Sequence, residues 1–218
     1  MKPKYSEIYE HYETCFDKHG DCAKGLDWPN EEDLKTRFDV MLGLASSTKA
    51  AYDEEKINIL DFGCGTAKLL DYISHEYDQG YFGYTGLDIS KKFIEHCIKK
   101  HPETTFHCMD ILQTPELLSG DHHIAICNGT FTMKMGLTFD DMFDYLKKTI
   151  TILFDKVKYG VAFNVMSKHV DWEKDELFHL PMDMLADFLC KEVTRNFVIR
   201  NDYGLYEYTT YIKKGENN

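Results

Sequence analysis

Short apolar runs alternate with amphipathic segments over most of this 218-residue chain. The runs have the length of buried strands and lie at 57–62, 84–88, 105–109, 123–127 and 157–165. Apolar residues at helical spacing follow them, at 66–77, 90–100, 138–154 and 182–192. Strands that are apolar throughout need cover on both faces of their sheet, and the intervening helices supply it. The alternation therefore predicts an α/β fold with a doubly wound, mostly parallel sheet.

Two further apolar runs, at 197–200 and 206–213, bring the predicted sheet to seven strands. The link between them, NDYGL, is short enough for a hairpin, so the last strand is expected to be antiparallel. Helical spacing also predicts two helices ahead of the first strand, over 4–18 and from Asn30 onward, with Asn30 as the N-cap. These two helices have no strand partner in the alternating pattern.

Composition and charge argue against several classes of partner. The formal net charge is −12, and an acidic chain repels phosphate backbones, so nucleic acid is not an expected partner. No apolar run has the length of a membrane span, and a membrane partner is not expected either. The seven cysteines are scattered, without a Cys-x-x-Cys pair, which is typical of free thiols in a reducing cytoplasm. No His, Asp or Glu set shows metal-ligand spacing, so no metal site is expected.

A glycine-rich turn, DFGCGTA at 61–67, follows the first predicted strand. Gly63 and Gly65 let the backbone turn sharply and approach a ligand closely. The helix that follows offers free N–H groups and a positive dipole end, which suit a carboxylate. Asp88 ends the second predicted strand, where a carboxylate can accept both hydroxyls of a ribose. Both features lie at the carboxyl ends of strands, where sheets of this kind bind ligands.

Met109, Asp110 and Ile111 follow the third predicted strand and complete a set of three strand-end motifs. The set resembles the S-adenosyl-L-methionine (SAM) binding core of the class I methyltransferases, over roughly residues 57–165. The third glycine of the family's turn is Ala67 here, a small departure because alanine is nearly as slim where the helix packs on the strand. The dinucleotide pattern G-x-G-x-x-G is not matched.

The resemblance assigns the turn after the first strand and the dipeptide after the fourth to the methionine end of SAM. The residues so assigned are Asp61, Gly63, Cys64, Gly65, Asn128 and Gly129. The first two glycines would pass beneath the methionine part, and the aspartate would orient the loop or the amino group. The dipeptide would lie below the sulfonium.

The resemblance assigns the next two strand ends to the nucleoside. Asp88 would accept the ribose hydroxyls and Ile89 would lie against the adenine. Asp110 would accept from the adenine amine, with Met109 offering a backbone N–H and Ile111 beside them. Each acid alone is equally compatible with a helix cap or a loop acid, but their joint order and spacing favour binding.

The flanking segments HGDCAKGLDWPNEEDLKTRF and FNVMSKHVDWEKDELFHLP resemble small methyltransferases associated with bacterial surface-polysaccharide genes. The resemblance implies one domain over 1–218, with residues 1–50 as a helical lid and 57–213 as the α/β core. Trp28 and Arg37 would cover the methionine end of SAM, where an arginine pairs bidentately with a carboxylate. The alternatives are a core or lid tryptophan and a surface arginine.

Polar residues after the fifth strand are expected to face the methyl acceptor. His169 in that loop and His19 in the N-terminal segment are the candidate general bases, and a solvated loop histidine is the alternative for each. The residues expected to bind the acceptor are Tyr9, Tyr12, Asn164, Lys168 and Tyr206.

The expected activity is methyl transfer from SAM to a small molecule, leaving S-adenosyl-L-homocysteine (SAH). A sugar-like or anionic, phosphate-type oxygen acceptor in surface-polysaccharide biosynthesis is the first hypothesis. N-methylation of an amino sugar or small amine, or a catalytically silent SAM-binding subunit, are the alternatives. The amino-methylating signature of nucleic-acid enzymes is absent, because residues 128–131 read NGTF. A monomer or a homodimer is expected.

Overall fold

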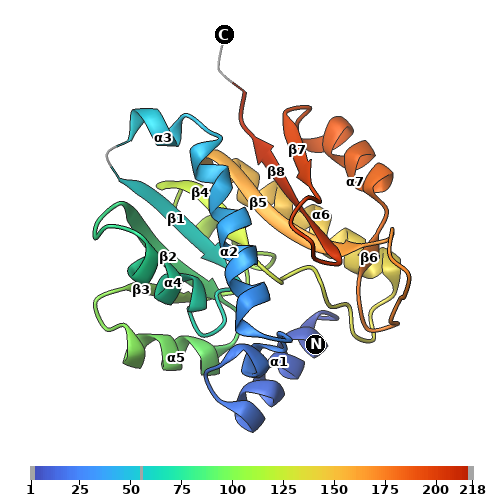
Figure 1. The fold of residues 1–218 in the computed structure, drawn as a ribbon, viewed down its shortest axis with the longest axis horizontal. Helices are drawn as coiled ribbons and strands as arrows, with labels where there is room; N and C mark the ends of the chain where they lie inside the picture. The colour runs from blue at the N-terminus through green and yellow to red at the C-terminus, as the bar shows by residue number, and fades with distance from the viewer. Residues whose placement is uncertain (1–2, 55, 216–218) are drawn as a thin grey trace.

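One mixed sheet runs through the molecule (Figure 1), and the computed structural model describes residues 3–54 and 56–215. Its strands are β1 (Ile57–Phe62), β2 (Phe82–Asp88), β3 (Thr105–Cys108), β4 (His122–Cys127), β5 (Val157–Ser167), β6 (His179–Leu180), β7 (Phe197–Arg200) and β8 (Glu207–Lys213). The strand order is β3-β2-β1-β4-β5-β8-β7, with β6 beside β5. The first five strands are parallel, and β8 runs antiparallel to both β5 and β7. The predicted fold class and the antiparallel last strand are therefore confirmed.

The structure differs from the predicted sheet at β5 and β6. The two residues of β6 pair in parallel with the end of β5, at Met166 and Ser167, and a strand this short carries no periodicity that a sequence could show. β5 itself continues to Ser167, so the predicted loop from Asn164 begins as strand. Side chains there alternate between the two faces of the sheet instead of gathering at one end.

Helices cover both faces of the sheet, as the alternating pattern predicts. They are α1 (Ser6–His19), α2 (Glu31–Ser46), α3 (Ala50–Asp53), α4 (Lys68–Glu76), α5 (Lys91–Lys100), α6 (Phe139–Lys156) and α7 (Met182–Phe188), with shorter turns η1 (Ala23–Leu26), η2 (Pro115–Leu117) and η3 (Leu189–Val193). Leu146 of α6 packs in one buried cluster with Leu60, and Met41 of α2 packs in a second with Ile59. Neighbouring residues of β1 therefore enter opposite cores.

The two N-terminal helices take different places. α2 begins at its predicted cap, where the Asn30 side chain accepts the N–H of Asp33 at 2.8 Å, and Met41 and Leu44 are fully buried against the sheet. α1 instead lies beyond the arrowheads of β1 and β2 (Figure 1). Of the predicted lid, only α1 and the segment after it therefore cover the ends of the strands. In the described ranges, no helix combines the length and apolarity that crossing a bilayer requires.

Candidate functional site

The turn from β1 to α4 has a backbone that side chains would obstruct. Gly63 and Gly65 have φ of 73° and 53°, in the left-handed region that favours glycine. A Cβ on Gly63 would lie 2.6 Å from Thr130 Oγ1, closer than a non-bonded contact allows. Ala67 has φ of 60° and is fully buried. A glycine at this position would therefore be favoured by conformation as well as by the helix packing expected from the sequence.

Asp88 joins this turn to the end of β2. Its Oδ2 accepts the N–H of Gly65 at 2.9 Å and its Oδ1 accepts the N–H of Ser90 at 2.8 Å. The carboxylate is 7% exposed, and burial raises its pKa to about 6 although these N–H donors favour the ionised form. Each oxygen keeps a second lone pair, so the carboxylate can still accept hydroxyl groups from a ligand.

Asp61 is the second buried acid of the turn. Burial raises its pKa to about 7, the nearby charge of Asp88 adds to the rise, and the Tyr84 hydroxyl, which donates to Oδ2 at 2.6 Å, opposes it. Both carboxyls have pKa values raised towards neutral pH, and a positively charged ligand would lower these pKa values because its charge favours the ionised forms.

A cavity at the ends of β1, β2, β3 and β4 collects nearly all of the residues assigned to the cofactor. Those that line it are Trp28, Asp61, Gly63, Cys64, Gly65, Asp88, Ile89, Met109, Asp110, Ile111, Asn128 and Gly129. We call it the first cavity. The Asn128 Oδ1 atom is buried there without a hydrogen-bond partner among the described residues. These features fit a ligand that carries hydroxyls and an amino group. They are a glycine turn without room for a Cβ, two buried acids and a buried amide oxygen without a partner. The role of each residue stays a prediction.

α1 covers the first cavity through side chains that no sequence pattern had indicated. The Tyr5 hydroxyl donates to Asp110 Oδ2 at 2.6 Å, and the Tyr5 ring lies 4.8 Å from that of Tyr145. Ser90, just after Asp88, donates its hydroxyl to Glu13. Because the partners are far apart in the chain, only the folded structure shows them to be neighbours.

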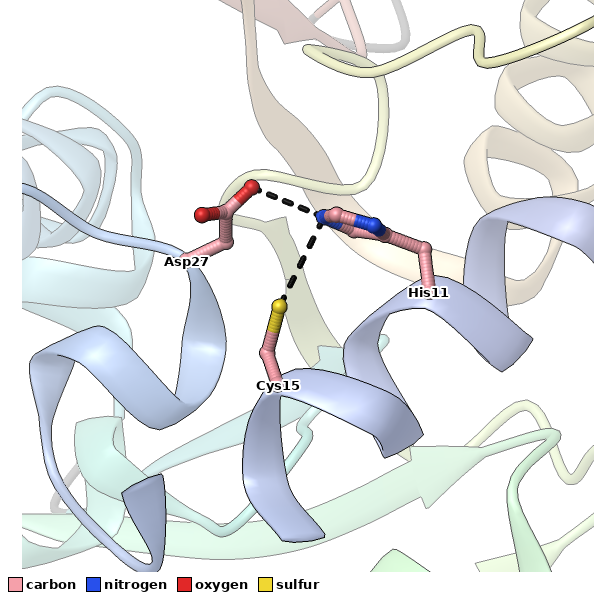
Figure 2. Close-up of side chains that lie close together, drawn as sticks. All are labelled: His11, Cys15 and Asp27. Carbon is pink, nitrogen blue, oxygen red and sulfur yellow. Dashed lines mark hydrogen bonds and ion pairs between the residues drawn. The ribbon is translucent and has the colours of Figure 1, made fainter. Parts of the chain in front are cut away.

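On another side of α1, three potential ligand groups meet (Figure 2). His11 Nε2 lies 2.8 Å from Asp27 Oδ2 and 3.6 Å from Cys15 Sγ. One ligand atom from each residue falls within 4.8 Å of the others. No metal-ligand set was expected from the sequence. Two members of this group lie one turn apart on α1, and the third, Asp27, lies beyond the helix.

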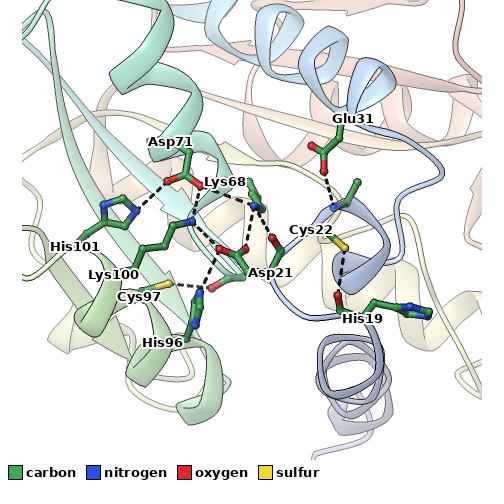
Figure 3. A network of polar contacts seen from close by, with 12 residues as sticks. His19, Asp21, Cys22, Glu31, Lys68, Asp71, His96, Cys97, Lys100 and His101 are labelled. Carbon is green, nitrogen blue, oxygen red and sulfur yellow. Dashed lines mark hydrogen bonds and ion pairs between the residues drawn. The ribbon is translucent and has the colours of Figure 1, made fainter.

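The segment after α1 is fixed to α4 and α5 by Asp21 (Figure 3). Its carboxylate lies 3.0 Å from Lys68 Nζ, 2.8 Å from Lys100 Nζ and 3.3 Å from His96 Nε2. Burial alone would raise the pKa of Asp21, but hydrogen bonds from Lys100, Thr66 and Lys68 outweigh it and hold the pKa well below its usual range. Partly buried ion pairs thus hold the segment after α1 against α4 and α5.

A second cavity, of about 500 Å³, adjoins the first and shares Tyr12, Leu26 and Trp28 with it. Polar and aromatic residues from both ends of the chain line it, namely His19, Lys24, Asp27, Asp33, Arg37, Trp172, Lys174, Glu176, Tyr206 and Glu207. Tyr9 lines only the first cavity. The predicted acceptor residues Tyr12 and Tyr206 and the candidate base His19 therefore meet around one space.

Arg37 occupies a different place from the one expected. It lies outside the first cavity, donates Nε–H to Glu207 Oε2 at 2.9 Å and stacks 4.2 Å from the centre of the Trp28 ring. Asn164 donates Nδ2–H to the other oxygen of Glu207 at 2.7 Å and accepts the N–H of Gly129 at 2.8 Å. A buried chain of polar contacts thus links the second cavity to the first.

Three residues predicted to face the acceptor line neither cavity. Asn164 is fully buried in β5, where its amide is taken up by Gly129 and Glu207. Lys168 is exposed and pairs with Glu173. His169 is exposed, and its N–H donates to Ser167 Oγ at 3.1 Å. The continuation of β5 is the physical reason, since it carries these side chains away from the open strand ends.

Comparison with known proteins supports the fold and the methyltransferase assignment. Residues 59–150 match the family model described as a methyltransferase domain. A candidate methyltransferase of Mycobacterium tuberculosis is 24% identical over 166 residues, which cover 73% of this chain and 95% of the relative.

Two solved structures share the fold over nearly the whole chain. The magnesium protoporphyrin IX methyltransferase of Synechocystis PCC 6803 with bound SAH has a TM-score of 0.59 and 13% identity, and the match covers 96% of this chain and 95% of that one. The plantazolicin methyltransferase BamL, in complex with a substrate analogue and SAH, has a TM-score of 0.60 and 13% identity, covering 97% and 91%. These likenesses confirm the predicted fold, and the domain match over residues 59–150 supports the predicted enzyme class, a SAM-dependent methyltransferase.

Gly63→Ala is expected to cost more stability than Gly204→Ala. Both glycines have positive φ, so either alanine pays about 1–2 kcal/mol of backbone strain. Around Gly204 a Cβ meets nothing within 4 Å, whereas at Gly63 it meets Thr130 at 2.6 Å. Urea denaturation should show an additional loss of about 1–3 kcal/mol for Gly63→Ala. Equal losses would mean that the turn relaxes without cost.

SAM affinity is expected to fall at least tenfold between about pH 8 and about pH 5.5, because Asp61 and Asp88, with pKa values of about 7 and about 6, must be ionised to bind a cation. The stability of the ligand-free protein should move the opposite way. Both folded-state pKa values exceed the unfolded value of about 3.9, so stability is lost as pH rises through this window. Titration calorimetry and thermal melts check both trends. An affinity independent of pH in the parent would contradict the assignment, and Asp61→Asn should flatten the upper part of the curve.

Proposed function

We propose that this methyltransferase transfers the methyl group of SAM, held in the first cavity, to an oxygen of a small sugar-like or anionic molecule held in the second. The observation that carries the proposal is the shared wall: Tyr12, Leu26 and Trp28 line both cavities. The two cavities adjoin at these residues, so direct transfer would take place where they meet, and fixing donor and acceptor there would lower the barrier.

The first cavity would hold SAM through the ends of three strands. Asp88 would accept the ribose hydroxyls, Asp110 and the Met109 N–H would meet the adenine, and Asn128 Oδ1 would accept from the amino group. When bound, SAM supplies a methyl group on a positively charged sulfur. The Tyr5 hydroxyl already bonds Asp110, so α1 would close over the adenine end and exclude water from it.

The walls of the second cavity support a hydroxylated or charged acceptor rather than a lipid. The buried pair of Arg37 and Glu207 lines it, as do the exposed Tyr206 and His19. Among the described residues, His19 is the histidine that lines this cavity, whereas His169 lines neither. His19 is therefore the better candidate to take the proton of an acceptor hydroxyl.

N-methylation of a small amine is the second candidate. Asp27, Asp33 and Glu176 also line the second cavity, and carboxylates there would attract an ammonium group. The related structures do not choose between the two, because one is a magnesium protoporphyrin IX methyltransferase and another a plantazolicin methyltransferase. A place in surface-polysaccharide biosynthesis rests on the sequence resemblance of the flanking segments alone.

We infer the cellular setting from charge and thiols. All seven cysteines are free, which suits a reducing cytoplasm. The net charge of −12 disfavours nucleic acid as the substrate. A monomer or a homodimer that acts on a freely diffusing acceptor is the arrangement that we propose.

Asp88→Ala is expected to weaken SAM and SAH binding at least tenfold. The change removes two ribose hydrogen bonds to a charged acceptor, each worth about 1.5–3 kcal/mol. Asp155→Ala, at an exposed aspartate of α6, is the matched control and should bind as the parent does. Titration calorimetry with SAH measures both. Unchanged SAH affinity of the Asp88 variant would show that Asp88 is not the ribose ligand. A parent protein that binds NAD and not SAH would remove the basis of the proposed function.

His19→Ala should lower turnover about a hundredfold, the typical share of a general base, and His169→Ala should leave it unchanged. The acceptor is first found by mass spectrometry of SAH formed with nucleotide sugars, sugar phosphates, amino sugars and small amines. Both histidines are exposed, so the pair is matched for burial. Equal turnover in the two variants would show that His19 is not the base, and methylation of the amines alone would favour the second candidate function.

A further inference from the structure

His11, Cys15 and Asp27 form a group of three metal-ligating side chains outside the first cavity (Figure 2). His11 and Cys15 lie one helical turn apart on the same face of α1. Asp27 follows η1, and its carboxylate points back at the same ring nitrogen that faces the thiol. An imidazole, a thiol and a carboxylate therefore converge on one point.

The distances suit a shared cation. In a tetrahedral zinc site, with bonds of about 2.0 Å to nitrogen and about 2.3 Å to sulfur, these two atoms lie roughly 3.5 Å apart. His11 Nε2 and Cys15 Sγ are 3.6 Å apart. The oxygen of Asp27, at 2.8 Å from the ring nitrogen, is at hydrogen-bond distance and would move out by roughly half an ångström to admit the ion.

The backbone at Asp27 directs its carboxylate towards α1. Its φ of 58° lies in the left-handed region, which aspartate and asparagine adopt more readily than other residues with a side chain. The N–H of Asp27 bonds the carbonyls of Ala23 and Lys24, so the turn is fixed.

We propose that His11, Cys15 and Asp27 bind one Zn²⁺ ion with a fourth position open. Thiolate and imidazole together select zinc over magnesium or calcium, which prefer oxygen ligands. Three protein ligands with one free position is the arrangement of reactive rather than closed structural zinc sites. The proposal differs from the expectation, drawn from the sequence, that the chain binds no metal.

The ion would border the acceptor space. Asp27 lines the second cavity, as does Tyr12, the neighbour of His11. The open position would take water or an oxygen of the molecule in that cavity, whose pKa a bound zinc lowers. Metal binding itself does not depend on the proposed function, but this consequence rests on it.

Burial and the nearby Asp27 raise the pKa of the Cys15 thiol, so the metal-free group holds that proton. Metal uptake must release it, because the thiolate is the ligand. A thiolate bound to cobalt has a strong near-ultraviolet charge-transfer band, which makes Co²⁺ the probe for this cysteine.

The test titrates Co²⁺ into the full chain after treatment with a chelator. The expected result is a thiolate-to-cobalt band that saturates at one equivalent and disappears when Zn²⁺ is added. Cys15→Ser should abolish the band. Cys22→Ser is the matched control, since Cys22 is another half-buried cysteine of the same segment outside the group, and it should keep the band. No band in the parent, or a band kept in Cys15→Ser and lost in Cys22→Ser, would overturn the proposal.

The other two ligands are tested by affinity. His11→Ala and Asp27→Asn should each weaken Zn²⁺ binding at least tenfold in competition with a colorimetric chelator, and unchanged affinity in both would also overturn the site. Asparagine tolerates the left-handed backbone, so Asp27→Asn removes the charge without new strain. The rise in melting temperature with SAH serves as the fold control in every variant. Because SAH should bind with or without metal, failure of the zinc site and failure of the proposed function give different results.

Discussion

The carboxylate of Asp88 is the interaction on which the cofactor side of the molecule depends. It accepts an N–H from the glycine turn after β1 and another from the loop after β2, and so fixes two strand ends against each other. Without it, the N–H of Gly65 would be left without that acceptor in a nearly dry environment, at a cost of about 1–3 kcal/mol. Burial keeps the pKa of this acid close to neutrality, so the same group that organises the turn also responds to a charged ligand.

A second buried network joins the first cavity to the second. Gly129 donates to Asn164, Asn164 donates to Glu207, and Glu207 accepts from Arg37, which stacks on Trp28. Glu207 is 1% exposed, and burial raises its pKa while the guanidinium opposes the rise. A buried carboxylate with both oxygens bonded is rigid, and it holds the wall that the two cavities share in one position.

The sequence was enough to predict what repeats along the chain, and it failed where the contacts are long-range. Strand and helix periodicity, the glycine turn and the acids that end β2 and β3 are local patterns, and the fold they predict is confirmed. The contact between Tyr5 and Asp110 spans 105 residues, and no local pattern indicates it. The residue types of Arg37 and Asn164 led to their assignment to SAM and to the acceptor. In the structure both bond Glu207, which is 170 residues from Arg37 and 43 residues from Asn164. His169 was misplaced because β5 extends further than its apolar run suggested.

The covering position of α1 has a consequence for the order of events in a catalytic cycle. Contacts from Tyr5, Glu13 and Asp21 hold this helix and the segment after it across the ends of β2 and β3 and against α4 and α5. Part of the lining of the second cavity comes from the C-terminal half of the chain, which these contacts do not restrain. Under the proposed function, an acceptor would therefore enter and leave past that half while the cofactor stays covered by α1. The expected order is a mechanism in which the cofactor binds first and its spent form leaves last, when α1 lifts.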